Sequence, residues 1–240
     1  MKVLKFWFLC FLNLHLLGVH SQNVKTVKIV QQIWSSENLS TRTFQNGDSI
    51  RVVKTKEEWV FCVENQIPAC VAYQFEEENA TTFGLLYNWF AVADKRNLAP
   101  KGFRIPSAAD FEKLLENQGK WAAQSLKSAG YWENEACRAC SLNGENCGTC
   151  QEERRSIKRK SVGAGNNSSG FNALPAGIID SNGYFDKIDN QSVFWTSTQV
   201  ENSAELVYCL PLRFGFNDAY LSSSLKGMGF SVRVVIDGGM

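Results

Sequence analysis

The sequence predicts an α+β protein in which two helices pack on short, twisted antiparallel sheets. Three observations support this fold class. Apolar residues at helical spacing occur in the first half of the chain, over 81–94 and 101–119. After residue 170, short runs separated by turn residues are typical of strands. Finally, 240 residues, of which 44% are hydrophobic, are enough for one well-filled domain.

The first 21 residues have the composition of a signal peptide. Lys2 and Lys5 precede the apolar run Phe6–Leu17, and small residues follow it. The remainder, 22–240, is expected to form a single domain and contains no other apolar run long enough to span a membrane. The predicted location is therefore secreted, periplasmic or on the outer cell surface.

Removal of this segment would take both histidines of the chain, His15 and His20, with it. A chain without histidine has no Ser-His-Asp or Cys-His catalytic arrangement, no histidine base and no histidine metal ligand. Two of the 25 Lys and Arg would also leave, so the 24 Asp and Glu nearly balance the rest. This balance gives no reason to expect nucleic acid as a partner, and we expect no enzymatic activity.

In the first half of the chain, the alternating residues 24–32 predict a strand, and Asn-Gly-Asp at 46–48 predicts a turn. Residues 52–62 have a mixed pattern, and Trp59 and Phe61 would share one face if they formed a strand.

A first helix is expected over 81–94, with Thr81 or Thr82 as its cap. The acidic run Glu76–Asn79 before it is interpreted as a solvated loop. The apolar arc of the helix is wide, which indicates that it is buried on most sides.

The segment Lys101–Gly119 carries the clearest helix signal. Ser107, with Asp110 three residues later, makes a capping-box-like start, and Gly119 is placed to end the helix in a left-handed conformation. The apolar residues that share one face are Phe111, Leu114 and Leu115. A helix of about three turns cannot bury this stripe alone, so it requires a packing partner.

The second half of the chain is expected to consist of strands and turns. The predicted strands are 171–179, 184–185, 192–198, 206–212 and 230–236. Acidic and amide residues at 180–186 resemble part of a calcium loop, but the twelve-residue pattern is incomplete and a β-turn is favoured. Three tryptophans are expected in the core, namely Trp34, Trp89 and Trp195.

Residues 136–162 are interpreted as an inserted surface loop, because they hold four cysteines and a basic run but few large apolar residues. The cysteines are Cys137, Cys140, Cys147 and Cys150. Two CxxC pairs can place four thiolates around one structural zinc ion. The alternative, favoured outside the cytosol, is two disulfides, for example Cys137 with Cys150 and Cys140 with Cys147.

Three cysteines lie outside this loop and the signal peptide. Cys62 and Cys70 can form a local disulfide, whereas Cys209, in a predicted strand, is expected to be a buried thiol. No cofactor is expected unless the four loop cysteines hold zinc.

Eight segments occur in the same order as in the Fibrobacter succinogenes major paralogous domain (FISUMP) family, which the chain resembles from about Val27 to Asp237. The segments are Gln32–Leu39 (QIWSSENL), Thr43–Ile50 (TFQNGDSI), Phe83–Val92 (FGLLYNWFAV), Ala99–Leu114 (APKGFRIPSAADFEKL), Leu126–Trp132 (LKSAGYW), Gly170–Gly177 (GFNALPAG), Phe194–Thr198 (FWTST) and Gly229–Val235 (GFSVRVV). The resemblance implies a C-type-lectin-like fold, in a superfamily that also contains the formylglycine-generating enzymes. It also implies a secreted or surface protein of a bacterium.

The chain departs from the family pattern at three places. Ala99 and Val234 stand where the family often has two cysteines, Phe103 stands where it often has Trp, and 136–162 is longer than the expected linker. The formylglycine-generating enzymes bind copper through a late pair of cysteines, whereas only Cys209 occurs late in this chain.

The resemblance names no activity, and the expected function is a secreted, non-catalytic module that binds a glycan or a protein at the cell surface. One alternative is a structural component of a surface assembly that contacts its partners through the Cys-rich loop. A second alternative is an enzyme of the formylglycine-generating superfamily.

Overall fold

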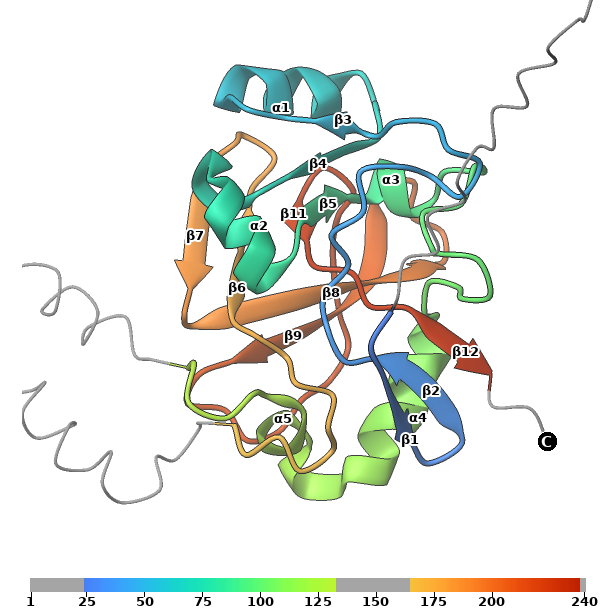
Figure 1. Ribbon diagram of the computed structural model, residues 1–240, viewed down its shortest axis with the longest axis vertical. Coiled ribbons are helices and arrows are strands. Elements are labelled where there is room, and N and C mark those ends of the chain that lie inside the picture. Colours follow the sequence, from blue (N-terminus) through green and yellow to red (C-terminus); the bar gives the residue numbers. More distant parts are fainter. Residues whose placement is uncertain (1–23, 133–164, 238–240) are drawn as a thin grey trace, which may run out of the picture.

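The computed structural model describes residues 24–132 and 165–237 (Figure 1). The predicted signal peptide (1–21) and the Cys-rich loop (136–162) lie outside these ranges, so the predicted extent of the domain stays a prediction. No helix in the described ranges combines the length and the apolarity needed to cross a membrane.

The described chain alternates short helices and short strands. The helices are α1 (Lys56–Glu64), α2 (Glu77–Phe83), α3 (Trp89–Val92), α4 (Ala108–Gln118) and α5 (Ala122–Leu126), with the 3-10 turns η1 (Tyr73–Phe75) and η2 (Gly119–Trp121). The strands are β1 (Thr26–Ile29), β2 (Gln32–Ser35), β3 (Arg51–Val52), β4 (Ala69–Val71), β5 (Leu86–Asn88), β6 (Ala176–Ile179), β7 (Phe185–Ile188), β8 (Gln191–Gln199), β9 (Leu206–Arg213), β10 (Ser222–Leu225), β11 (Gly229–Phe230) and β12 (Val235–Asp237).

These strands form two sheets. The smaller has the order β1-β2-β12, and the larger has the order β10-β9-β8-β6-β11-β5-β4-β3, with β7 paired to β6. Figure 1 shows the long strands β8 and β9 across the middle of the molecule, α1 beside β3 at one end, and α4 beside the smaller sheet. The predicted α+β class is therefore confirmed, and more of the chain is helical than the two predicted helices.

The larger sheet is mixed rather than purely antiparallel as predicted. β3 and β4 are parallel, because α1 lies between them in the chain and carries it back to the same end of the sheet. β6 and β8 are also parallel. The remaining pairs in both sheets are antiparallel.

Two segments predicted as single strands are divided. Residues 24–32 hold a turn at Val30 (φ 56°), across which β1 and β2 pair as a hairpin. Residues 230–236 supply β11, which lies between β5 and β6, and β12, which pairs with β2. The last part of the chain therefore joins the two sheets.

The helix α4 begins and ends where the sequence predicts. Ser107 and Asp110 form a capping box, and Gly119 (φ 65°) follows the last helical residue. The ring centroids of Phe111 in α4 and Trp34 in β2 are 5.0 Å apart, and both side chains are fully buried. The smaller sheet is therefore the packing partner that this helix requires.

The buried carboxylate of Asp110 also fixes the start of α4. Arg104 donates to both of its oxygens, at 2.5 and 3.0 Å, and Gln32 Nε2 donates to Oδ1 at 2.8 Å. The backbone N and the Oγ of Ser107 each donate to Oδ2 at 2.7 Å. Burial alone would raise the pKa of Asp110, but the hydrogen bonds from Arg104 and Ser107 outweigh it and lower the pKa to about 2.

This lowered pKa predicts that acid weakens the fold at α4. The pKa of Asp110 lies below its ordinary value of 3.8, so its stabilisation is complete above that pH and is lost as the pH falls towards 2. Asp110→Asn should lower the free energy of unfolding by about 2 kcal/mol at neutral pH. In this variant the free energy of unfolding should also decrease less than in the wild type as the pH falls. Urea unfolding between pH 2 and pH 6 measures both effects.

The control for this prediction is Glu116→Gln, which changes an exposed carboxyl group on the same helix. It should keep the wild-type dependence of stability on pH. An Asp110→Asn protein with the wild-type dependence would contradict the prediction.

The predicted helix 81–94 is wrong in its middle, where β5 separates α2 from α3. Gly84 ends α2 with φ 78°, and a Cβ atom there would lie 2.7 Å from the Cβ of Asn38. Tyr87 in β5 is fully buried, because β5 lies between β4 and β11. A strand buried on both faces and a helix buried on most sides both give a nearly continuous run of apolar residues, which explains the error.

Residues 52–62 were expected to place Trp59 and Phe61 on one face of a strand, but they contain most of α1. Thr55 caps this helix, and its hydroxyl accepts a backbone N–H of the first turn at 3.2 Å. Trp59 is fully buried whereas Phe61 is 49% exposed, because residues two apart on a helix do not share a face. The acidic run Glu76–Asn79 begins α2 instead of forming a loop.

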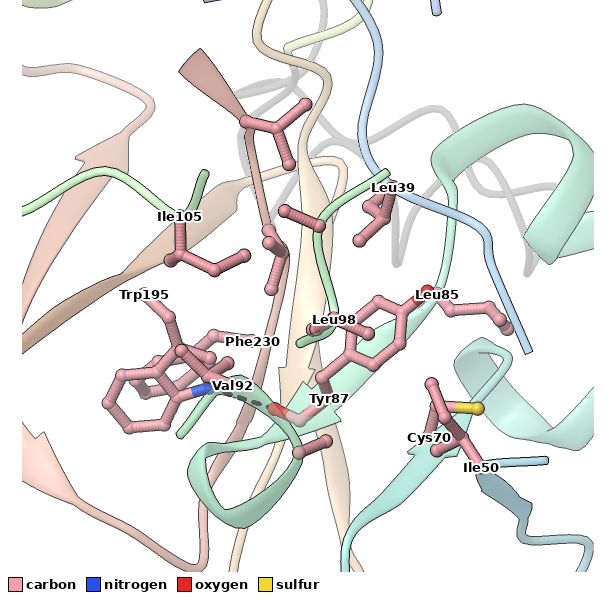
Figure 2. Packing of buried hydrophobic residues seen from close by; sticks show 14 of the residues in the cluster. Leu39, Ile50, Cys70, Leu85, Tyr87, Val92, Leu98, Ile105, Trp195 and Phe230 are labelled. Carbon is pink, nitrogen blue, oxygen red and sulfur yellow. Dashed lines mark hydrogen bonds between the residues drawn. The ribbon is translucent and has the colours of Figure 1, made fainter. Parts of the chain in front are cut away.

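The largest group of buried side chains lies around β5, β8 and β11 (Figure 2). Trp195 Nε1 donates to the carbonyl oxygen of Tyr87 at 2.8 Å, and the ring centroids of Trp195 and Phe230 are 4.4 Å apart. Trp34 and Trp195 are buried as predicted, whereas Trp89 is only partly buried.

The predicted local disulfide is wrong, because Cys62 and Cys70 are both free and buried. Cys62 lies on α1 and packs in a cluster with Trp59, whereas Cys70 lies on β4 and packs in the cluster of Figure 2. The two thiols therefore belong to different parts of the core. Cys209 is a buried free thiol, as predicted.

Candidate functional site

A shallow depression lies between the end of β9 and the start of β10. Its volume is about 120 Å³, below the roughly 300–1,000 Å³ typical of small-molecule pockets. The residues that line it are Pro211, Arg213, Phe216, Asp218, Ala219, Tyr220 and Ser222. A ligand would therefore rest on this surface instead of being enclosed by it.

Two aromatic side chains of the depression are open to solvent, since Phe216 is 52% exposed and Tyr220 is 64% exposed. Both belong to the loop 214–221, which joins β9 to β10. The exposed Trp121 precedes α5, and α5 donates a backbone hydrogen bond to the same loop. The two exposed aromatic side chains of the loop are an apolar surface of the kind that is typical of a recognition site.

The buried Lys127, which follows α5, holds this loop in place. Its Nζ donates to the carbonyl oxygens of Arg213 (2.9 Å) and Phe216 (2.8 Å). These residues enclose a turn in which Gly215 has φ 81°. Burial lowers the pKa of Lys127 to about 8. The ammonium group thus fixes the backbone of the depression but does not line its surface.

Two groups of opposite charge line the depression without pairing with each other. Neither the guanidinium of Arg213 nor the carboxylate of Asp218 forms an ion pair within the described residues. By contrast, Arg104 and Asp110 at the start of α4 satisfy one another. The depression therefore offers a charged donor and a charged acceptor to a ligand.

A second depression, of about 350 Å³, lies near the first described residues. Its lining residues are Val24, Lys25, Ser35, Glu37, Asn38, Leu39, Ser40 and Val234. None of them is aromatic, and Lys25 Nζ pairs with Glu37 Oε1 at 2.6 Å. Its charges are therefore already paired, which makes it the weaker candidate for recognition.

The fully buried Arg233 is bonded to the wall of this second depression. It donates four hydrogen bonds, to Asn38 Oδ1 (2.8 Å) and to the carbonyl oxygens of Ser35 (2.7 Å), Phe171 (2.7 Å) and Asn172 (3.0 Å). Its guanidinium also lies 4.5 Å from the ring centroid of Phe171. Burial lowers the pKa of Arg233 to about 9. These contacts join three distant segments, so the role of Arg233 is structural.

The predicted metal and disulfide residues form no site in the described structure. Those of the Cys-rich loop lie outside the described ranges, namely Cys137, Cys140, Cys147 and Cys150. Their zinc and disulfide alternatives therefore stay predictions. No group of three or more His, Cys, Asp or Glu among the described residues could hold a metal ion.

The segment 180–186 forms the predicted turn, with Gly183 N donating to the carbonyl oxygen of Asp180 at 3.0 Å. Asp180 Oδ1 accepts the backbone N–H groups of Asn182 (2.9 Å) and Tyr184 (2.8 Å). This carboxylate is therefore used within its own turn.

Sequence reasoning did not identify the residues that line the first depression. The available signal is RFGFNDAY at 213–220, in which aromatic residues are interspersed with turn residues beyond the predicted strand 206–212. Turn residues place a segment on the surface, where an aromatic side chain has no core to enter. The pairing of β9 with β10, which brings Pro211 and Ser222 to the same depression, required the tertiary structure.

No curated protein and no solved structure matches this chain. The model of one family, described as the Fibrobacter succinogenes major domain, matches residues 27–235. The match includes both described ranges almost completely, and with them both sheets and the depression between β9 and β10. Because it extends over most of the chain, the protein belongs to the Fibrobacter succinogenes major domain family.

Proposed function

We propose that the protein is an exported, non-catalytic module that binds a glycan at the cell surface through the depression between β9 and β10. The observation that carries the proposal is the pair of exposed aromatic side chains, Phe216 and Tyr220, beside the charged side chains of Arg213 and Asp218 in the same depression. An aromatic ring offers a large apolar face at low conformational cost, and a sugar ring has an apolar face that can stack on it.

The shape of the depression supports a ligand that lies on the surface. A volume of about 120 Å³ suits the face of one ring better than an enclosed molecule. The loop 214–221 is anchored by the Lys127 ammonium through two carbonyl oxygens, so its aromatic residues are held before a ligand arrives. Such preorganisation lowers the entropy lost on binding.

The described side chains also support a non-catalytic role. The buried thiols of Cys70 and Cys209 have pKa values raised by burial to about 12, so neither is a ready nucleophile. Asp110 and Lys127, whose pKa values are lowered to about 2 and about 8, are bonded within the fold and do not line the depression. We include in the proposal that binding needs no cofactor.

Export and a C-type-lectin-like fold are further parts of this proposal. The composition of residues 1–21 supports export. The mixed sheets with a few short helices, together with the family resemblance, support the lectin-like fold, although a fold by itself implies no ligand.

A glycan array with the exported chain tests the proposal. We expect Tyr220→Ala to reduce retention on the bound glycans about tenfold or more, because stacking and a hydroxyl group are lost together. The matched control is Tyr184→Ala, which removes a similarly exposed tyrosine outside the depression. It should bind as the wild type does.

Two outcomes would count against the glycan. Equal retention of Tyr220→Ala and the wild type would exclude this depression as the site. Capture of a purified cell-surface protein, but of no glycan, by a contact that Tyr220→Ala abolishes would replace the glycan with a protein ligand.

A further inference from the structure

We propose that the depression between β9 and β10 takes a neutral sugar with two adjacent free hydroxyl groups, and that it does so without a metal ion. This inference rests on the proposed glycan binding and adds the chemical class of the ligand. It starts from two charged residues, Arg213 and Asp218, which line the same depression and form no ion pair with any other described residue.

The two charged groups have opposite hydrogen-bonding abilities. The guanidinium of Arg213 only donates, whereas the ionised carboxylate of Asp218 only accepts. A hydroxyl group both donates and accepts. Two adjacent hydroxyl groups can therefore donate to Asp218 and accept from Arg213 at the same time, and these charge-assisted bonds are stronger than neutral ones.

The same pair of charges disfavours charged sugars. A carboxylated sugar would be attracted to Arg213 but repelled by Asp218, and an amino sugar would meet the reverse situation. Juxtaposed like charges lower affinity and thereby exclude wrong ligands. A neutral ring meets neither repulsion.

The other side chains of the depression also suit a sugar ring. Tyr220 and Ser222 bring hydroxyl groups to the depression, while Phe216 and Tyr220 bring ring faces. A sugar ring can thus contact aromatic carbon with one face and polar groups with its edge. The backbone beneath Arg213 and Phe216 is fixed by Lys127, so these groups are held on a rigid support.

The residues that line the depression do not supply the ligands of a calcium ion. Asp218 is the one carboxylate among the seven residues that line the depression. Calcium takes six to eight oxygen ligands, usually with several carboxylates, and a single carboxylate on an open surface does not supply them. The sugar hydroxyl groups must therefore be bound by the side chains themselves.

The test uses the full exported chain and immobilised mannan, dextran, galactan and polygalacturonate. The first three are neutral, and polygalacturonate consists of the carboxylated form of galactose. We expect at least one neutral polysaccharide to be retained, polygalacturonate to bind at least tenfold more weakly, and EDTA to have no effect. Periodate oxidation followed by borohydride reduction, which destroys adjacent hydroxyl pairs, should abolish retention.

Two substitutions isolate the charged groups. Asp218→Asn and Arg213→Gln should each weaken binding of the retained polysaccharide about tenfold, because each removes one charge-assisted contact. The matched controls are Asp186→Asn and Arg51→Gln, which change exposed charged residues outside the depression and should bind as the wild type does.

Several results would overturn the inference. These are stronger retention on polygalacturonate than on every neutral polysaccharide, loss of binding in EDTA, or wild-type affinity of both Asp218→Asn and Arg213→Gln. Stronger retention on polygalacturonate than on the neutral polysaccharides, through a contact that depends on Tyr220, would overturn the inference and leave the proposed function intact. If no glycan is retained by a Tyr220-dependent contact, both fail together.

Discussion

Arg233→Ala is expected to lower the free energy of unfolding by about 4 kcal/mol. The guanidinium of Arg233 is fully buried and donates four hydrogen bonds, three of them to backbone carbonyl oxygens. Its removal leaves buried acceptors unsatisfied, at about 1–3 kcal/mol each, and leaves a cavity beside Phe171. Partial rearrangement and entry of water reduce the sum to the expected value.

Denaturation in urea, followed by tryptophan fluorescence, measures this loss. The control is Arg51→Ala, an exposed arginine in β3, which should change stability by about 0.5 kcal/mol or less. Arg233→Lys should lie between alanine and the wild type, since an ammonium group cannot reach all four acceptors at once. If Arg233→Ala unfolds at the same urea concentration as the wild type, these hydrogen bonds make no net contribution to stability.

Gly177→Ala is expected to be nearly as damaging, for two separate reasons. Gly177 has φ 68°, which costs a residue with a Cβ atom about 1–2 kcal/mol. In addition, a Cβ atom there would lie 2.6 Å from Tyr73 Cε2 and 2.8 Å from the carbonyl oxygen of Asp186. Overpacking of this kind adds about 1–3 kcal/mol, so a total loss of about 4 kcal/mol is expected.

Gly102→Ala separates the two reasons for the loss at Gly177. Gly102 has φ 89°, but nothing lies within 4 Å of the position that a Cβ atom would take. Its replacement should therefore cost only the conformational part, about 1–2 kcal/mol. Thermal unfolding of both variants measures the difference. Equal losses would mean that β6 and η1 move apart freely enough to remove the contact with Tyr73.

The sequence was sufficient where the signal was local. The bounds of α4 follow from Ser107, Asp110 and Gly119, which lie within the helix or next to it in the chain. β8 and β9 follow from apolar residues in long runs between turns, and the burial of Cys209 follows from its place in such a run. Capping, turn formation and periodicity are determined by neighbours in the chain, so they can be read without the rest of the fold.

Only part of the candidate site could be predicted from the sequence. The aromatic residues in the turn-rich segment 213–220 were visible, but nothing local showed that Arg213 and Asp218 would line one depression. That depends on the register of β9 with β10 and on Lys127, which follows α5 and is far away in the chain. The lining residues lie close together in the chain, within 211–222, but their support by a distant lysine is a tertiary contact, which periodicity does not supply.

By itself, the sequence determined the α+β class, the capped helix α4, the long strands β8 and β9 and the family resemblance. Only the tertiary structure decided that 81–94 is divided by β5, that 230–236 is shared between two sheets, and that Cys62 and Cys70 lie in different clusters. The first two share a physical reason. A short apolar segment buried on every side has no polar face to give it a period, so contacts between distant segments choose its structure.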